Sequence, residues 1–191
     1  MDGGLLPDEP VPIRLMNTVW ADRTGVHDAL GTPRELRAWL AAAYPREQVR
    51  GADLDRFRAL RDALRRIAAL LTADTRPAAA STTRSARQAV AELNRAAALA
   101  PTYPQLTLSG GQLRGTRTGP ATPADRLLST IAAEAVDLFT GDSGATIRAC
   151  HAPGCVLYFR QDHPRREWCS AACGNRARVA RHYERHRRTP P

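Results

Sequence analysis

All four cysteines of this 191-residue chain fall within 24 consecutive residues, as two close pairs. Four residues separate Cys150 from Cys155, thirteen follow, and three separate Cys169 from Cys173. This spacing is typical of tetrahedral zinc, because each pair lies on a tight turn and the spacer returns the chain to the metal. A segment this short cannot bury a core unaided, so the ion would supply much of its folding energy. We expect one structural Zn²⁺ bound by these four cysteines.

Other interpretations of the cysteines stay open. They could be unpaired structural thiols, or they could hold an iron–sulfur cluster, which also uses four thiolates. Disulfides are not expected, since a reducing cytoplasm disfavours them. His151 and His163 could replace a ligand, but His151 is adjacent to Cys150, and adjacent side chains rarely reach one ion.

The residues around the cysteines predict a small α+β zinc finger that is treble-clef-like. Residues 156–159 are strand-like, residues 162–164 form a turn, and residues 165–168 lead back, which predicts a hairpin between the two cysteine pairs. Ser170 can then cap a helix whose first turn holds Cys173.

The excess positive charge is concentrated near the cysteines. The net charge is +9, and from Gly144 onward ten arginines face three acidic residues. The preceding residues carry 18 arginines and 16 acidic residues, and the chain has no lysine. Such concentration is typical of a protein with a polyanionic partner, although a basic tail can also be merely solvated.

The helix expected after Cys173 has a basic face. Arginines recur there at steps of three and four residues, namely Arg178, Arg181, Arg185 and Arg188. Val179 and Tyr183 lie on another face and are expected to pack on the finger. Arginines on a rigid helix suit phosphate contacts and guanine recognition in double-stranded DNA. Further phosphate contacts could come from the predicted hairpin, through Arg160, Arg165 and Arg166. The alternative is a solvated helix, or one that docks on an acidic patch of another protein.

The rest of the chain is predicted to be mainly α with a small β-hairpin. Helices are expected over residues 32–43, 53–71, 86–97 and 122–140. Thr32, Asp53 and Thr122 are placed to cap three of them. Apolar alternation on both sides of Gly110 and Gly111 predicts the hairpin, over residues 106–114. Loops are expected at residues 76–80 and 115–123, and residues 141–144 should begin the link to the cysteines.

Several functional classes are not expected. The mean hydropathy is −0.40, and no apolar run approaches the ~20 residues that cross a bilayer. The first twelve residues lack the regions of a secretory signal, so we expect a cytoplasmic protein without membrane contact. Residues 141–144 superficially resemble the nucleophile segment of serine proteases, but no histidine is placed as a base. Since a four-thiolate zinc site also leaves no position for catalytic water, we expect no enzyme activity.

The residues from Trp168 to Arg176 resemble the CGNR zinc-finger family, whose Cys-Gly-Asn-Arg motif stands intact at Cys173–Arg176. The Cys150–Cys155 pair also fits the family's pattern, and the resemblance covers about the last 45 residues. It implies that the four cysteines are ligands and that Gly174 permits close backbone packing beside the metal. It also implies a structural or a DNA-contacting role for Asn175 and Arg176.

The N-terminal part is similar to the ABATE domain, which usually precedes this finger. The likeness is carried by residues 15–18, Arg23, Asp28 and residues 32–40. Proteins of this kind are regarded as stress-induced bacterial transcription regulators. Their helical domain could sense a ligand, and a pocket could be lined by Asn17, Trp20, Arg23 and Asp28. Alternatively, these four residues cap secondary-structure elements and pair with other residues at the surface.

Together these observations predict an ABATE-like helical regulatory domain over residues 1–143 and a CGNR-type finger with a basic helix over residues 144–191. We expect a nucleoid-associated transcription regulator that binds double-stranded DNA. Because a lone finger gives little affinity, a homodimer is expected, and a small-molecule effector is a hypothesis. The alternative is a zinc-stabilised protein-interaction module whose helical domain senses a ligand or dimerises, without direct DNA binding.

Overall fold

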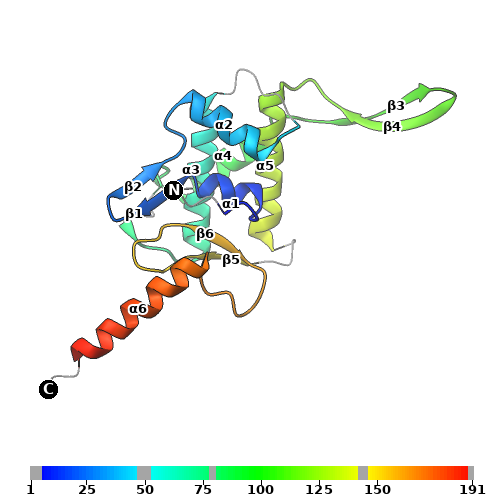
Figure 1. Ribbon diagram of the computed structural model, residues 1–191. Coiled ribbons are helices and arrows are strands. Elements are labelled where there is room, and N and C mark those ends of the chain that lie inside the picture. The colour runs from blue at the N-terminus through cyan, green and yellow to red at the C-terminus, as the bar shows by residue number, and fades with distance from the viewer. Residues whose placement is uncertain (1–5, 47–52, 78–80, 142–145, 189–191) are drawn as a thin grey trace.

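The computed structural model describes residues 6–46, 53–77, 81–141 and 146–188. Within these residues the chain is about half helical, with small antiparallel strand pairs (Figure 1). The expected domain boundary after residue 143, residues 142–144 of the expected link and residues 78–80 of the expected loop lie outside the described part.

The elements follow in the order α1 (Val11–Met16), β1 (Val19–Asp22), β2 (Gly25–Asp28), α2 (Pro33–Ala43), α3 (Leu54–Leu71), α4 (Ala86–Ala97), β3 (Tyr103–Ser109), β4 (Gln112–Thr118), α5 (Pro123–Thr140), β5 (Thr146–Ala149), β6 (Tyr158–Gln161) and α6 (Ala171–Arg188). The helices expected before the cysteines are confirmed as α2 to α5. Their predicted caps form as well: Thr32 Oγ1 accepts a hydrogen bond from the Glu35 amide, and Thr122 Oγ1 accepts one from the Asp125 amide.

Helices α1 to α5 share one apolar core. The buried stripe of α3 includes Phe57, Leu60 and Leu64, none of which is exposed to solvent. Burying each side chain of this size contributes about 1.5–3 kcal/mol. Arg65 is also buried on α3, and its Nη1 donates to the Met16 carbonyl at 2.9 Å. The end of α1 is therefore fixed against α3 by both apolar and polar contacts.

The sheet of β5 and β6 packs against this helical core. Ile147, Ala149 and Tyr158 of the sheet are buried in the same cluster as the helix residues. The sheet lies below the helices in Figure 1, and α6 extends from it away from the body. The cysteine segment therefore rests on the helical part rather than standing apart from it.

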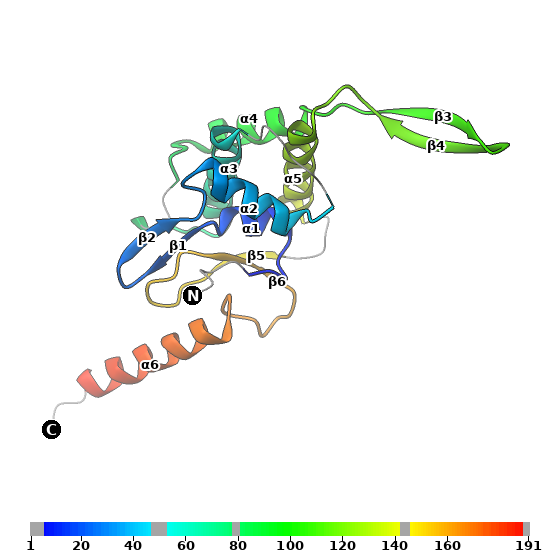
Figure 2. The same cartoon turned by 45° about the horizontal axis from the view of Figure 1, so that its top comes forward.

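The hairpin of β3 and β4 projects from the body as an arm (Figure 2). It confirms the predicted hairpin with longer strands, and Leu108 pairs with Leu113 beside the turn. Leu106, Leu108 and Leu113 lie on one face of the arm, each at least 66% exposed. We call this surface the leucine face.

Two features of the N-terminal part were not expected from the sequence. The short helix α1 and the hairpin of β1 and β2 precede the first predicted helix. In this hairpin the rings of Trp20 and His27 stack with centroids 4.2 Å apart. Among the described residues, no helix has the length and apolar character needed to cross a membrane.

Candidate metal centre and basic helix

The first cysteine pair lies on a tight turn between β5 and β6. The Cys155 amide donates to the Ala152 carbonyl at 2.9 Å, and the Cys150 amide donates to the Leu157 carbonyl at 2.9 Å. Gly154 has φ +74°, a left-handed conformation that a side chain disfavours. Glycine at this position therefore allows the turn to bring Cys150 and Cys155 together.

This turn corrects the predicted hairpin. The sequence predicts that residues 156–159 and 165–168 pair between the two cysteine pairs. Instead β6 pairs with β5, so that Ala149 lies opposite Tyr158 and the hairpin encloses the first cysteine pair. Residues 165–168 form no strand, because β5, which the pattern missed, pairs with one edge of β6, and Asn17 bonds the backbone of Tyr158 on the other edge.

The second cysteine pair lies at the start of α6. Ser170 Oγ accepts a hydrogen bond from the Cys173 amide at 3.3 Å, as the predicted cap requires. A Cβ atom at Gly174 would stand 3.1 Å from Cδ1 of Trp168, so a side chain here would require this ring to shift. The close packing expected at Gly174 is therefore packing against Trp168.

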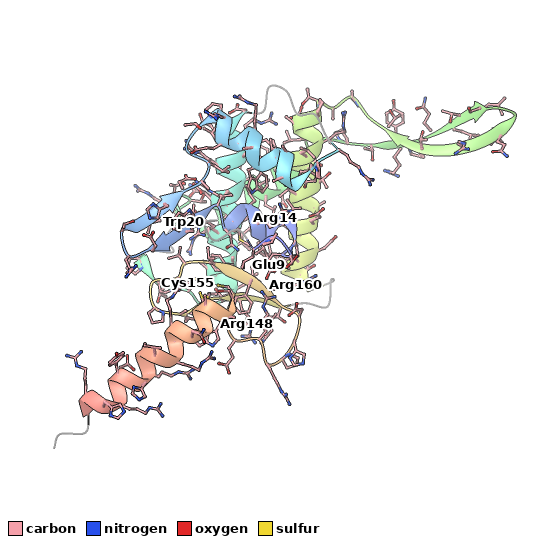
Figure 3. All side chains as sticks on the ribbon, viewed as in Figure 1. Glu9, Arg14, Trp20, Arg148, Cys155 and Arg160 are labelled. Carbon is pink, nitrogen blue, oxygen red and sulfur yellow. The ribbon has the colours of Figure 1, made fainter. Side chains whose placement is uncertain are left out.

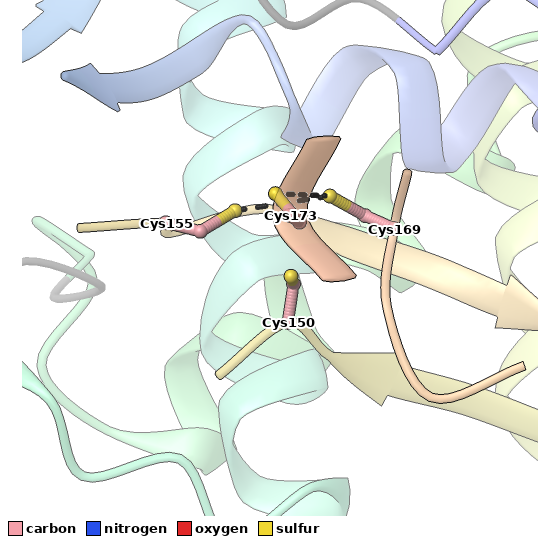
Figure 4. A group of neighbouring side chains, drawn as sticks. All are labelled: Cys150, Cys155, Cys169 and Cys173. Carbon is pink, nitrogen blue, oxygen red and sulfur yellow. Dashed lines mark hydrogen bonds between the residues drawn. The ribbon is translucent and has the colours of Figure 1, made fainter. Parts of the chain in front are cut away.

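The four sulfur atoms converge (Figure 4). All lie within 4.8 Å of one another, and all four cysteines are buried. The Sγ atoms of Cys155 and Cys169 are 3.8 Å apart, and those of Cys169 and Cys173 are 3.3 Å apart. With Zn–S bonds of about 2.3 Å, the sulfurs of a tetrahedral site stand about 3.8 Å apart. The cluster therefore has the donors and the size for one metal ion.

The four thiols change one another's acidity. Hydrogen bonds with Cys155 and Cys169 lower the pKa of Cys150 to about 7. Hydrogen bonds with the other three cysteines lower the pKa of Cys173, while hydrogen bonds with Cys150 and Cys173 raise the pKa of Cys155 and of Cys169. Several thiolates cannot share so small a space without a positive charge. Arg176 supplies part of it, because its Nη2 donates to Cys173 Sγ at 3.0 Å.

The two histidines that could replace a ligand lie away from the sulfurs. His151 is exposed, and His163 Nδ1 accepts a hydrogen bond from the Arg165 amide at 3.1 Å. Among the described residues, the group that could hold a metal consists of the four cysteines.

Sequence reasoning missed the contacts by which the helical body holds the cysteine turn. Arg76 Nη1 donates to the carbonyls of Cys150 and Cys155, at 2.6 and 2.5 Å. Asp74 binds the same guanidinium through both carboxylate oxygens and accepts from Tyr158 Oη at 3.2 Å. Burial raises the pKa of Asp74, but the hydrogen bonds from Arg76 outweigh burial and keep that pKa below its ordinary value. No sequence signal marked these residues, because Arg76 fell in an expected loop.

A second tether joins the N-terminal residues to β6. Glu9 accepts from the Arg160 amide at 2.9 Å and from Arg166 Nη2 at 2.6 Å (Figure 3). The Arg166 guanidinium also lies over the ring of Phe159, 5.0 Å from its centroid. These three arginines, Arg160, Arg165 and Arg166, were predicted to contact phosphate. Arg166 instead bonds Glu9 within the chain, Arg160 is half-buried, and Arg165 is exposed.

Beyond its first turns, α6 is exposed. Arg178, Arg181 and Arg185 are all exposed, and the side chain of Arg188 lies outside the described part. The expectation that Val179 and Tyr183 pack on the finger is wrong, because they are 54% and 65% exposed. After Ala177 the helix extends away from the body, so its described side chains face mainly solvent (Figure 3). Asn175 is exposed and accepts a hydrogen bond from Arg178.

The four residues predicted to line a ligand pocket serve different roles. Asn17 is fully buried and bonds the backbone of Tyr158. Asp28 binds Arg61 at 2.6 Å, Trp20 stacks on His27, and Arg23 is exposed between β1 and β2. Asn17 and Asp28 therefore have partners within the chain, and the ligand pocket stays a prediction.

Comparison with protein families confirms both resemblances. The ABATE model, described as "putative stress-induced transcription regulator", matches residues 9–142. The CGNR zinc-finger model matches residues 146–186. A comparison with curated proteins gives no match.

Proposed function

Since the chain belongs to the ABATE family and carries a CGNR zinc finger, we propose that it is a DNA-binding transcription regulator whose finger holds one zinc ion. The regulator role follows the description of the ABATE family. Recognition of DNA by α6 and the identity of the metal are the parts that this proposal adds.

Zinc is the metal that the donor set supports best. Cys150, Cys155, Cys169 and Cys173 offer four sulfurs at tetrahedral spacing. When bound, the ion offsets part of the negative charge of the thiolates and supplies folding energy to this short segment. The chain's own residues do the positioning: Arg76 holds the first cysteine pair, and Ser170 fixes the start of α6 at the second.

The observation that carries the DNA proposal is the solvent-exposed basic face of α6. Arg178, Arg181 and Arg185 are exposed on a helix that extends from the metal centre into solvent (Figure 1). Its 18 residues span about 27 Å, and a helix of about 10–12 Å diameter fits the major groove. In α6 the sole acidic residue is Glu184. The metal centre therefore sets the direction of the helix, and the arginines supply phosphate and guanine contacts.

The other motif residues divide between structure and contact. Arg176 bonds the Cys173 sulfur, so we assign it to the metal centre. Asn175 is exposed beside Arg178, which places it where it can contact DNA or orient that arginine. Arg165 is free for a phosphate contact, whereas Arg166 is held by Glu9.

The leucine face of the arm supports a homodimer. A two-stranded hairpin alone is marginally stable in water, and three exposed leucines on one face favour a covered surface. A two-fold dimer would use the same face on both copies. The arm points away from α6, so such a dimer leaves both basic helices accessible (Figure 2).

A second candidate function is a protein-interaction module. The exposed Val179 and Tyr183 on α6 favour it, since apolar side chains on a helix face suit a protein groove. The two candidates differ in salt dependence, because phosphate contacts weaken steeply with added salt and apolar contacts do not.

Selection from random duplex DNA with the zinc-loaded chain tests the proposal. We expect an enriched sequence motif that the double variant R181A/R185A fails to enrich. The variant R37A removes an exposed arginine of α2 and should enrich the same motif. Absence of a motif with the zinc-loaded chain, together with weak binding at physiological salt, would favour the interaction module.

A further inference from the structure

A basic pocket lies between the end of α3, the segment that follows it and the residues before α4. Its volume is 320 Å³. Three arginines line it, namely Arg66, Arg76 and Arg84, together with Thr75 and Thr83. None of the lining residues belongs to α6, which carries the proposed DNA surface.

The charge of the pocket is not balanced by its own lining. Asp74 is its acidic residue, but its side chain is fully buried and bonds Arg76 and Tyr158. Arg66 Nε is buried and has no hydrogen-bond partner in the described part of the chain. Within the described part of the chain neither Arg66 nor Arg84 forms an ion pair, so an anionic ligand would supply the missing counter-charge.

The surroundings add donors of the same kind. Helix α4 begins at Ala86, two residues after Arg84, and the N-terminal end of a helix carries partial positive charge. Thr75 is exposed and Thr83 is half-buried, and each carries a hydroxyl that can donate. Guanidinium groups with hydroxyls form a donor set that recognises phosphate.

We propose that this pocket binds a small phosphate-bearing anion as an effector of the protein. Arg66 and Arg84 provide the charge, and Arg76 joins the pocket to the metal centre, since it also holds the carbonyls of Cys150 and Cys155. An anion in the pocket therefore contacts the same Arg76 guanidinium that holds the cysteine turn. This inference concerns a different surface from α6 and stands whether or not α6 binds DNA.

Calorimetric titration of the zinc-loaded full chain tests the site, with inorganic phosphate and AMP as separate probes at constant ionic strength. We expect saturable binding of one anion per chain, weakened at least about tenfold by R66Q and by R84Q. Tighter binding of AMP would identify a phosphorylated metabolite as the source, and equal binding would identify free phosphate.

The matched control is R87Q, which removes the same charge from the exposed first turn of α4, outside the lining. It should leave phosphate binding unchanged. Since Arg84 is exposed, R84Q keeps the test valid even if R66Q impairs folding. No saturable binding up to about 10 mM, or equal loss in R87Q, would overturn the proposal. So would loss of DNA affinity in R84Q with phosphate binding intact, which would assign the pocket to the DNA surface.

Discussion

The side-chain amide of Asn17 forms two hydrogen bonds with the backbone of Tyr158, 141 residues away in the sequence. Its Nδ2 donates to the Tyr158 carbonyl at 2.9 Å, and its Oδ1 accepts from the Tyr158 amide at 2.9 Å. Both residues are fully buried, so no solvent can replace either bond. Asn17 therefore serves β6 as a short strand partner and fixes the cysteine hairpin to the end of α1.

Replacing Asn17 with alanine should lower the free energy of unfolding by about 2–4 kcal/mol, because two buried backbone groups lose their partners. The measurement is urea denaturation of the zinc-loaded chain at pH 7. Asn94 is exposed on α4, and N94A should change stability by less than about 0.5 kcal/mol. If N17A were as mild as N94A, the hairpin would not depend on this contact.

Asp28 should make stability depend on pH. Burial raises the pKa of Asp28, but hydrogen bonds from Arg61 and the Leu30 amide outweigh burial and hold it below its ordinary value of 3.8. A carboxylate with a lowered pKa stabilises the fold above its unfolded pKa, and this stabilisation is lost as pH falls through the folded pKa.

D28N should therefore be less stable than the parent chain by about 1 kcal/mol at pH 7, a modest value because the side chain is 36% exposed. The difference should shrink as pH falls below the ordinary pKa of 3.8. Denaturation of both proteins at several pH values across this range measures the difference in stability. Loss of metal in acid affects both proteins alike and so does not change the difference. A difference that grows in acid would contradict the assignment.

The helices were predictable from the sequence because their signals are local. Thr32, Asp53 and Thr122 each precede an apolar pattern and each forms the predicted cap. The cysteine cluster was predictable for a similar reason, since the spacing of its four cysteines can be read from one short stretch of the sequence.

The missed features depend on contacts over long sequence separations. Helix α1 has six residues and β5 has four, which is too few for a hydrophobic periodicity to be recognised. Arg76 and Glu9 reach the cysteine segment only in the folded chain, across 74 to 157 residues. The periodicity of α6 places Val179 on an apolar face, but it cannot tell whether the body extends that far.

The arginines of α6 should control the salt dependence of DNA binding. R181A and R185A should each weaken binding to duplex DNA and reduce the slope of log affinity against log salt by about one. Fluorescence anisotropy at several salt concentrations gives this slope, with R37A as an exposed control outside α6. Affinity that is insensitive to salt would instead favour a protein partner.

The leucine face should determine whether the chain dimerises. L108K places a charge at the centre of that face and should weaken self-association by about 2 kcal/mol, or roughly 30-fold. Thr107 is the neighbouring residue on the opposite face, so T107K adds the same charge there and should leave the dimer intact. Sedimentation velocity over a range of concentrations distinguishes the two. A monomeric parent chain, or equal dissociation in T107K, would contradict the dimer.

Every functional proposal for α6 depends on one zinc ion bound by sulfur alone. On protein purified without chelator, elemental analysis measures the zinc content, and X-ray absorption spectroscopy identifies the atoms bound to the zinc. We predict one zinc per chain, with four sulfur neighbours at about 2.3 Å. Less than about half an equivalent of zinc, or a shell in which nitrogen or oxygen replaces sulfur, would contradict the four-cysteine centre.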